Sequence, residues 1–346
     1  MSTIEKVDHP AAWTAASLCA RSAAWTFRLS DEDVDELERA LRQVETRGLC
    51  VPRFGSDAFP IPRLEARLAP FREELNLGLG VLSITGLPVT RYTRDQASAI
   101  FWGLGSHFGR PWAQNMRGHL LGDVIDEGKS VDDPTARGYQ TTAALEMHTD
   151  GADLVALLCL KQAPEGGEFR FVSAMSVFNR LADTHPDVLQ HLLDTQWCID
   201  GRGEEAPGEL PWHRGCVYER IPEGVACLAL IGYISSAQRH PDVPRLSAFD
   251  RAALEVFQAA SEDPGLVCRV HQQPGDILFL NNHFHMHGRS TFRDAQDPRE
   301  RRHLRRLWLE SDCWSGRRPR VMERILRNAR SWWDKPDSTV QMWDHT

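Results

Sequence analysis

The chain has 346 residues, of which 42% are hydrophobic and 25% charged, an ordinary composition for a globular protein. A net charge of -8 provides no electrostatic footprint for nucleic acid or for an anionic membrane surface. No apolar run is long enough to span a bilayer, and the N-terminus lacks a basic-then-apolar signal segment. The eight cysteines are scattered without a Cys-x-x-Cys pair, which favours a reducing, cytoplasmic location.

The first part of the chain is predicted to be mainly helical. Ser30 is a suitable N-cap for a helix with acids in its first turn and an apolar stripe, and Gly48 ends that helix. After a Pro-rich link, a second amphipathic helix is predicted over 64–75. Residues 78–85 have the pattern of a buried strand, and Thr93 is a plausible N-cap for a helix running to about Phe108.

The remainder of the chain is dominated by strand patterns. A helical segment over 176–193, broken at His185-Pro186, and a helix over 246–261 interrupt them. Strands are predicted over 120–125, 153–161, 168–173, 216–218, 225–231, 267–271, 276–281 and 303–309. This order favours an α+β protein with a jelly-roll barrel (a double-stranded β-helix) wrapped by helices, rather than a parallel α/β sheet.

No shift in composition marks a domain boundary, so residues 1–346 are predicted to form a single domain. It would comprise a helical flank (1–77), a jelly-roll core with a helical insert (78–310) and a helical tail (311–346). Acids interleave with the arginines and tryptophans of the tail. The tail is therefore expected to pack on the barrel or on a second subunit rather than to bind nucleic acid.

A metal site is predicted around His148-Thr149-Asp150. In an extended segment, His148 and Asp150 point to the same side and can reach one ion. By itself this motif is weak, because a surface turn is the likelier explanation for a histidine and an aspartate two residues apart. A third ligand is available in the segment 279–289, where spacing alone does not choose between His283, His285 and His287. Two histidines and one carboxylate form the facial set of non-haem Fe(II) oxygenases.

Two arginines support this hypothesis. If the strand predicted over 303–309 is extended back by one residue, Arg302, Leu304 and Arg306 share one face, so both arginine side chains can line the same cavity. An arginine on an apolar barrel strand requires a carboxylate partner. A dicarboxylate cosubstrate would provide one.

With these segments in view, the sequence resembles the taurine dioxygenase / clavaminate synthase-like family of Fe(II)- and 2-oxoglutarate-dependent oxygenases. The motifs that carry the resemblance are His148-Thr149-Asp150-Gly151, Asn281-Asn282, His287-Gly288-Arg289-Ser290-Thr291-Phe292 and the segment 302–309. The resemblance implies His148, Asp150 and His287 as the iron ligands, with His283 and His285 in supporting or packing roles. It implies that Arg302 clasps the distal carboxylate of 2-oxoglutarate and that Arg306 contacts cosubstrate or substrate.

One feature departs from the family pattern. Relatives often place Thr or Ser after the Gly-Gly-acid turn to help hold that carboxylate, whereas here the turn continues into Phe169. Either Ser173 or a water takes over, or the pocket is altered. The substrate-pocket amides suggested by the resemblance are Gln140, Asn115 and Gln114, for which capping of loop backbone is an equally good explanation. Arg289 is a candidate for substrate binding or for a structural salt bridge.

The implied reaction needs Fe(II), 2-oxoglutarate and O2, and releases succinate and CO2 while a substrate C–H bond is oxidised. Hydroxylation of a small polar molecule, with an amino acid or amino-acid-derived acid leading, is the default expectation. Desaturation or ring closure is an alternative outcome, and Asp150 argues against a halogenase. Two other classes stay open: a non-catalytic jelly-roll binding protein, favoured by Phe169, and a zinc hydrolase, which leaves the arginines unexplained. The expected partner is a small molecule, with a homo-oligomer possible.

Overall fold

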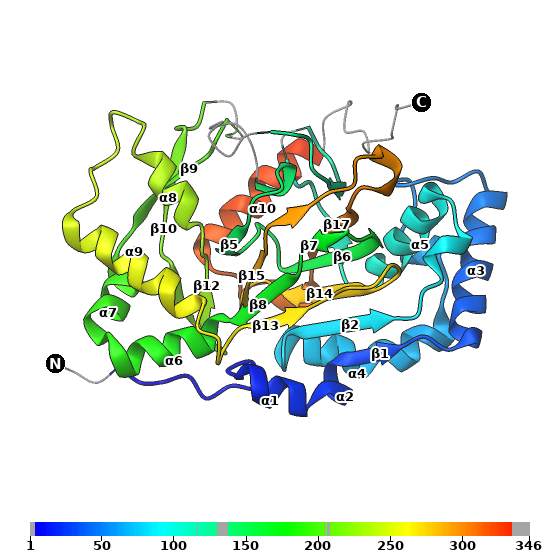
Figure 1. The fold of residues 1–346 in the computed structure, drawn as a ribbon, viewed down its shortest axis with the longest axis horizontal. Helices are drawn as coiled ribbons and strands as arrows, with labels where there is room; N and C mark the ends of the chain where they lie inside the picture. Colours follow the sequence, from blue (N-terminus) through cyan, green and yellow to red (C-terminus); the bar gives the residue numbers. More distant parts are fainter. Residues whose placement is uncertain (1–3, 116, 130–137, 204, 206–207, 334–346) are drawn as a thin grey trace.

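The computed structural model describes residues 4–115, 117–129, 138–203, 205 and 208–333. Helices and strands are mixed in this part of the chain (Figure 1). The helices are α1 (Ala15–Ala20), α2 (Ser22–Trp25), α3 (Asp31–Thr46), α4 (Pro62–Leu77), α5 (Arg94–Ser106), α6 (Ala174–Thr184), α7 (Pro186–Asp194), α8 (Ile231–Ala237), α9 (Ala248–Ser261) and α10 (Arg320–Trp333).

The larger sheet has a central strand that is shielded on both sides. β14 lies antiparallel between β2 and β6, and its five residues are all buried, which explains its continuous apolar sequence. The strand order is β1 (Thr26–Arg28), β2 (Val81–Thr85), β14 (Ile277–Asn281), β6 (Leu154–Lys161), β17 (His303–Glu310) and β3 (Arg110–Pro111), with β4 (Leu121–Val124) also paired to β17.

A second sheet contains β13 (Cys268–Val270), β8 (Phe169–Ser173), β15 (His285–Arg289) and β5 (Leu145–His148), in that order. Among the described strands, hydrogen bonds do not join the two sheets into a closed barrel. Three two-stranded pairs complete the strand set: β9 (Trp197–Asp200) with β10 (Trp212–Gly215), β11 (Tyr218–Ile221) with β12 (Gly224–Cys227), and β7 (Glu165–Gly166) with β16 (Phe292–Arg293).

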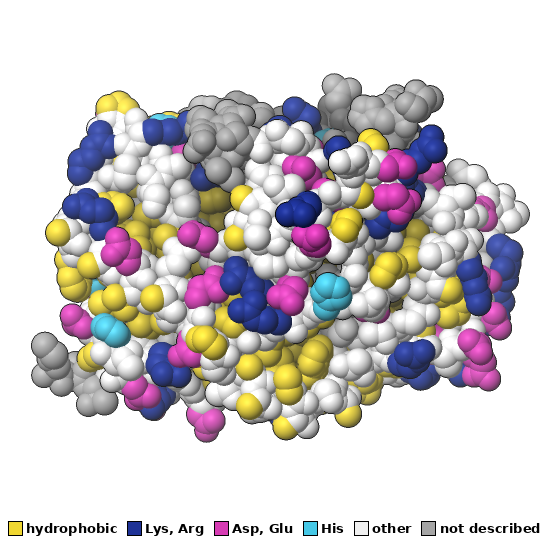
Figure 2. Space-filling model, in the orientation of Figure 1, with side chains coloured by type: hydrophobic (Ala, Val, Ile, Leu, Met, Phe, Trp, Pro, Cys, Tyr) yellow, Lys and Arg dark blue, Asp and Glu magenta, His cyan; other side chains and the backbone are white. Residues whose placement is uncertain are grey.

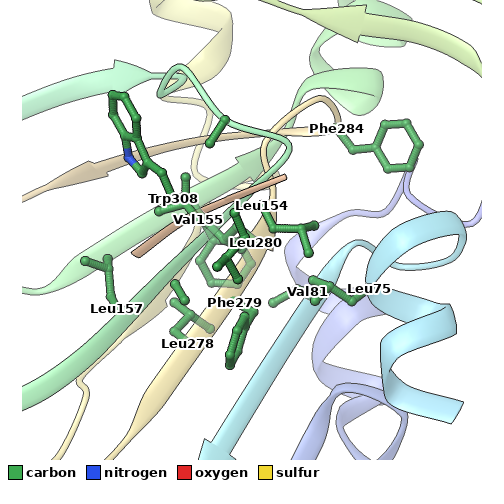
Figure 3. Close-up of a cluster of buried hydrophobic side chains, with 14 of the residues drawn as sticks. Leu75, Val81, Leu154, Val155, Leu157, Leu278, Phe279, Leu280, Phe284 and Trp308 are labelled. Carbon is green, nitrogen blue, oxygen red and sulfur yellow. The ribbon is translucent and has the colours of Figure 1, made fainter. Parts of the chain in front are cut away.

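The hydrophobic core is built on the larger sheet. Figure 3 shows side chains of β2, β6, β14 and β17 meeting there, together with a residue of α4. The labelled members include Leu75, Val81, Leu154, Phe279 and Trp308, none of which is more than 7% exposed. Burial of this apolar surface is the main stabilising contribution to the fold.

Helices cover the strands from two sides (Figure 1). α3 and α5 lie at one end of the molecule, and α6, α7, α8 and α9 lie at the other. Both predicted N-caps are confirmed: Ser30 and Thr93 each accept the backbone N–H three residues later, and in both cases that residue bonds back. The predicted break at His185-Pro186 is confirmed as the boundary between α6 and α7.

The strand predicted over 225–231 is wrong beyond Cys227. β12 ends there, and α8 begins at Ile231. The apolar residues continue through this segment because it crosses the interior, and a short apolar run does not distinguish a strand from a buried helical turn. No helix in the described part of the chain is long and apolar enough to cross a membrane.

Candidate metal centre

Two neighbouring strands carry the predicted histidine ligands. His148 ends β5, and its Cα partner across the antiparallel pair is His287 of β15. The centroids of the two imidazole rings are 4.5 Å apart. Asp150 follows two residues after His148, and its Oδ2 lies 3.7 Å from His287 Nε2. Ligand atoms from all three residues lie within 4.8 Å of one another, so the structure brings the predicted set together around one point.

The turn that presents Asp150 is held by side chains from other parts of the fold. Asn282, which follows β14, accepts the Asp150 backbone N–H on its Oδ1 (2.9 Å) and donates from Nδ2 to the Ala152 carbonyl (3.0 Å). The Thr149 hydroxyl is fully buried and accepts the backbone N–H of Ala229 (3.0 Å). The direction of the carboxylate is therefore set by the fold before any ion binds.

Further hydrogen bonds orient the ligand side chains. His148 Nδ1 donates to the Glu146 carbonyl (2.8 Å), which leaves Nε2 as the nitrogen with a free lone pair. Trp308 Nε1 donates to Asp150 Oδ2 (2.9 Å), and the Arg306 guanidinium lies 3.2 Å from the same oxygen. His287 Nδ1 is buried with no hydrogen-bond partner among the described residues.

The electrostatics suit a divalent cation. Burial, and then the neighbouring His287, lower the pKa of His148 to about 4, so its imidazole is neutral at physiological pH. Burial acts to raise the pKa of Asp150, but Arg306 and His287 outweigh it and hold the pKa well below its usual range. Two imidazoles and one ionised carboxylate form the donor set of a non-haem Fe(II) site. The residues present therefore fit the metal that the sequence predicts.

The two competing histidines are engaged elsewhere. His283 Nε2 donates a buried hydrogen bond to Asp153 Oδ1 (3.0 Å). His285 Nδ1 bonds the Asn281 carbonyl (3.0 Å), and its ring stacks on Trp13 with centroids 5.3 Å apart. Neither residue lines the cavity in front of the three ligands, which agrees with the supporting and packing roles expected for them.

A cavity of about 550 Å³ opens in front of the three ligands. Its lining confirms the predicted alternation along β17, because Arg302, Leu304, Arg306 and Trp308 all face it. The intervening His303 and Arg305 instead bond Asp123.

Arg302 is only 5% exposed, and its NH1 has no hydrogen-bond partner in the described structure. A buried guanidinium without a carboxylate leaves a strong site for an anionic ligand.

Arg306 and Gln114 form one unit at the cavity wall. Gln114 Oε1 accepts from Arg306 Nε (2.8 Å), and Gln114 Nε2 donates to the Arg306 carbonyl (2.9 Å). Gln114 thus reaches the cavity as predicted, but its amide is used to position Arg306. Arg289, at the end of β15, also lines the cavity. Arg289 forms no ion pair with any carboxylate of the described residues, so the structural salt bridge expected as one alternative for Arg289 is not found among them.

Three predicted site residues lie elsewhere. Ser173 is not among the residues that line the cavity: its hydroxyl donates to the Ala11 carbonyl and accepts the Ser176 N–H that caps α6. The prediction that Ser173 contacts the cosubstrate is therefore wrong. Asn115 folds back on its own loop, with Oδ1 accepting the Arg117 N–H (3.0 Å). Gln140 donates to Glu127 (2.8 Å) and does not line the cavity.

The sequence reasoning missed several contributors to the site. Asn282 and Trp308 belong to the motifs Asn281-Asn282 and 302–309, but nothing in the local sequence shows that they form hydrogen bonds with Asp150 or its turn. The outer wall also went unpredicted, because its parts come from distant segments that meet only in the fold. It is formed by residues of β9 and β10, the segment between them, α8 and α10: Ile199, Arg202, Leu210, His213, Tyr233, Arg324, Ile325 and Asn328.

Three converging ligands beside buried, unpaired guanidinium groups define a mononuclear non-haem Fe(II) oxygenase that uses a 2-oxo acid. The family model for "Taurine catabolism dioxygenase TauD, TfdA family" matches residues 45–308, and the chain belongs to this family. It is therefore an Fe(II)- and 2-oxoglutarate-dependent dioxygenase, as the sequence indicates.

The chain is similar to several characterised proteins. FR-33289 synthase of Streptomyces rubellomurinus (strain ATCC 31215) is 30% identical over 297 residues, which cover 83% of this chain and 86% of that protein. Enduracididine beta-hydroxylase of Streptomyces hygroscopicus is 27% identical over 354 residues, covering 86% and 97%. The fold resembles that of an asparagine oxygenase solved with Fe(II), 2S,3S-3-hydroxyasparagine and succinate, with a TM-score of 0.64, 18% identity and coverage of 82% and 93%.

Proposed function

We propose that this dioxygenase hydroxylates a C–H bond of a small polar acid, an amino acid or amino-acid-derived acid. The observation that carries the proposal is the surplus of positive charge at the ligands. Beside the metal position, Arg289, Arg302 and Arg306 line the cavity together with the carboxylate of Asp150. The other charged side chains of the lining are two arginines and four acids: Arg202, Arg324, Glu146, Asp200, Glu205 and Glu209. Bound Fe(II) would add positive charge, and 2-oxoglutarate is a dianion. The net positive charge that remains beside the metal position favours a substrate that is itself anionic.

The relatives agree with this substrate class. Enduracididine beta-hydroxylase is named as a hydroxylase, and the asparagine oxygenase was solved with 3-hydroxyasparagine, a hydroxylated amino acid. The cavity volume of about 550 Å³ lies within the range typical of small-ligand pockets. Desaturation or ring closure stays an alternative outcome of the same chemistry.

In this proposal each residue has a defined task. His148, Asp150 and His287 hold the iron, and Arg302 holds the distal carboxylate of 2-oxoglutarate. Bound iron supplies the redox chemistry that couples loss of CO2 from 2-oxoglutarate to C–H oxidation. Arg306, kept in place by Gln114 and Asp150, binds the substrate carboxylate. The apolar part of the wall excludes water from the reacting centre.

The two facing sheets and the fold of the relatives support a jelly-roll barrel as the core of a single domain spanning residues 1–346. Acidic and basic side chains are interspersed on the face shown in Figure 2, which agrees with a small-molecule partner rather than nucleic acid or membrane. All eight cysteines are free thiols, which supports the cytoplasmic location that we propose. A homo-oligomer is compatible with these features.

An anaerobic titration tests the proposed function. Metal-free protein is loaded with Fe(II), then titrated with 2-oxoglutarate while the visible charge-transfer band of the chelate is followed. We expect a band in the wild type that is absent in His287→Ala and needs a much higher 2-oxoglutarate concentration in Arg302→Met. Succinate release with a panel of amino acids and related acids then identifies the substrate. A wild-type protein that binds iron but forms no chelate would instead support the non-catalytic binding protein.

A further inference from the structure

Arg289 and Arg302 meet in one corner of the cavity although they belong to different parts of the fold. Arg289 ends β15 of the smaller sheet, and Arg302 immediately precedes β17 of the larger sheet. Their guanidinium carbons lie 4.5 Å and 5.3 Å from the centroid of the same ring, Phe292. Arg306, in contrast, lies against Asp150 and Gln114. The corner formed by Arg289 and Arg302 is thus distinct from the position of Arg306.

The guanidinium of Arg289 is only partly satisfied. Its NH2 donates to the backbone carbonyls of Thr141 (2.8 Å) and Ala143 (2.6 Å), which ties that segment to β15. Its Nε and NH1 are buried without a hydrogen-bond partner in the described structure, as is NH1 of Arg302. The two residues are 3% and 5% exposed. Buried N–H donors without acceptors are unfavourable, so this corner favours a ligand that accepts several hydrogen bonds.

The charges of the two arginines are not paired directly: the acidic side chains that act on them, Asp126 for Arg289 and Asp294 for Arg302, lie beyond ion-pair distance. Neither arginine forms an ion pair with a carboxylate among the described residues. A carboxylate has two oxygens and about four lone-pair sites, enough to accept from two guanidinium groups at once.

The residue opposite Arg289 contributes no donor. Phe169 of β8 is the Cα partner of Arg289 across the antiparallel pair, and its ring stacks on His287 with centroids 5.6 Å apart. Position 169 is where the family pattern often has a hydroxyl. The hydrogen-bond donors missing from that strand are available directly across the pair, from the guanidinium of Arg289.

We propose that Arg289 and Arg302 together clamp the distal carboxylate of 2-oxoglutarate, with Arg289 replacing the hydroxyl that Phe169 lacks. This inference rests on the proposed function, since it needs 2-oxoglutarate as the ligand. It assigns Arg289 to the cosubstrate rather than to the substrate. It also explains how a pocket with a phenylalanine at position 169 retains its affinity for the cosubstrate.

The test compares two 2-oxo acids that differ only at the far end. 2-Oxoglutarate carries the distal carboxylate, whereas 2-oxopentanoate has a methyl group in its place and keeps the chelating end. Dissociation constants for both are measured anaerobically from the chelate band of the Fe(II) protein. We expect Arg289→Met to weaken binding of 2-oxoglutarate roughly 10- to 100-fold and to change 2-oxopentanoate binding less than about 3-fold. Arg289→Lys keeps the positive charge but loses the planar guanidinium that can donate two hydrogen bonds at once. Its dissociation constant for 2-oxoglutarate should lie between those of the wild type and Arg289→Met.

Arg170→Met is the matched control. Arg170 follows Phe169 on β8 and does not line the cavity. Like Arg289, its guanidinium donates to a backbone carbonyl, in this case that of Leu145. We expect both 2-oxo acids to bind this variant as they bind the wild type. If Phe169→Thr also restores part of the 2-oxoglutarate affinity of Arg289→Met, the two positions supply the same interaction.

The remaining outcomes separate a failure of the clamp from a failure of the proposed function. Equal weakening of both 2-oxo acids in Arg289→Met would show that the residue only supports the 141–143 segment, and the clamp would be rejected. Unchanged binding of 2-oxoglutarate would reject it as well. No chelate in the wild type would overturn the proposed function itself, which separates that failure from a failure of the clamp.

Discussion

The carboxylate of Asp150 has three neighbours that compete for its oxygens: the metal position, Arg306 and the indole of Trp308. Trp308 holds Oδ2 with a neutral donor, so it orients the carboxylate without opposing the charge of a bound cation. A sequence motif reveals the ligand but not the group behind it. Trp308 lies 158 residues away from Asp150 along the chain, and only the pairing of β17 beside β6 brings them together.

We predict that Trp308→Phe lowers the affinity for Fe(II) roughly 10- to 100-fold, because the carboxylate loses the hydrogen bond that fixes it. Iron binding by the apo-protein under anaerobic conditions measures the change. Trp314→Phe is the control: Trp314 is also buried, but its Nε1 has no hydrogen-bond partner in the described structure. Equal loss of iron affinity in both variants would mean that core packing, not the hydrogen bond, is responsible.

His213, on the outer wall, predicts a dependence of stability on pH. Burial and then Arg324 lower its pKa to about 4, whereas an unfolded histidine has a pKa near 6.5. Between pH 4 and 6.5 the unfolded state binds more protons at His213 than the folded state does. The contribution of His213 to stability is therefore fully present above about pH 6.5 and is lost as the pH falls toward 4. Unfolding of metal-free wild type and His213→Asn across this range should give a shallower pH dependence for the variant. If the free energy of unfolding changes with pH equally in both proteins, groups other than His213 cause the pH dependence.

At the scale of elements, periodic patterns predicted more than isolated residues did. The alternation of β17 placed Arg302 and Arg306 in the cavity correctly, because a strand buried on both faces still sends alternate side chains to opposite sides. The choice of Ser173 failed for a related reason. It ends β8 and its hydroxyl begins α6 as the N-cap, a local use that competes with any role in a ligand site.

The connection between β14 and β15 sets the shape of the metal site. Asn282 lies in this connection, is 1% exposed, and bonds the backbone of the turn that carries Asp150. We predict that Asn282→Ala lowers the free energy of unfolding by about 3 kcal/mol, because it leaves a buried N–H and a buried carbonyl without partners. Chemical denaturation measures the loss. Asn179→Ala, which removes a part-buried amide bonded to Val7, is the comparison. An equal loss of stability in this variant would argue against a special role for Asn282.

At the scale of the whole molecule, a buried ionic cluster joins the C-terminal segment to the metal-binding turn. Asp153 accepts from His283, from the Ser311 backbone and from Arg318, whose side chain is 4% exposed. Arg318 lies two residues before the start of α10, and three residues of α10 line the cavity. The predicted packing of the tail on the core is confirmed for its described part, while Trp343 and the rest of 334–346 lie outside the described residues.

We predict that Arg318→Met destabilises the protein by about 3–5 kcal/mol, since it leaves the buried carboxylate of Asp153 with fewer partners. Thermal and chemical unfolding measure this effect. Lys6→Gln removes an ion pair with Asp183 whose members are 54% and 55% exposed, and should change stability by less than about 1 kcal/mol. A small effect of Arg318→Met would show that the C-terminal segment is held mainly by its apolar contacts.

The iron ligands and the outer wall of the cavity belong to different segments of the chain. The spacing of His148 and His287 follows from the pairing of β5 with β15, whereas Leu210, Tyr233 and Ile325 come from the β9–β10 segment, α8 and α10. The wall can therefore vary while the redox centre stays constant. A combinatorial library restricted to those wall positions would sample new substrates in an enzyme that still loads iron and cosubstrate, which makes this chain a practical starting point for directed evolution.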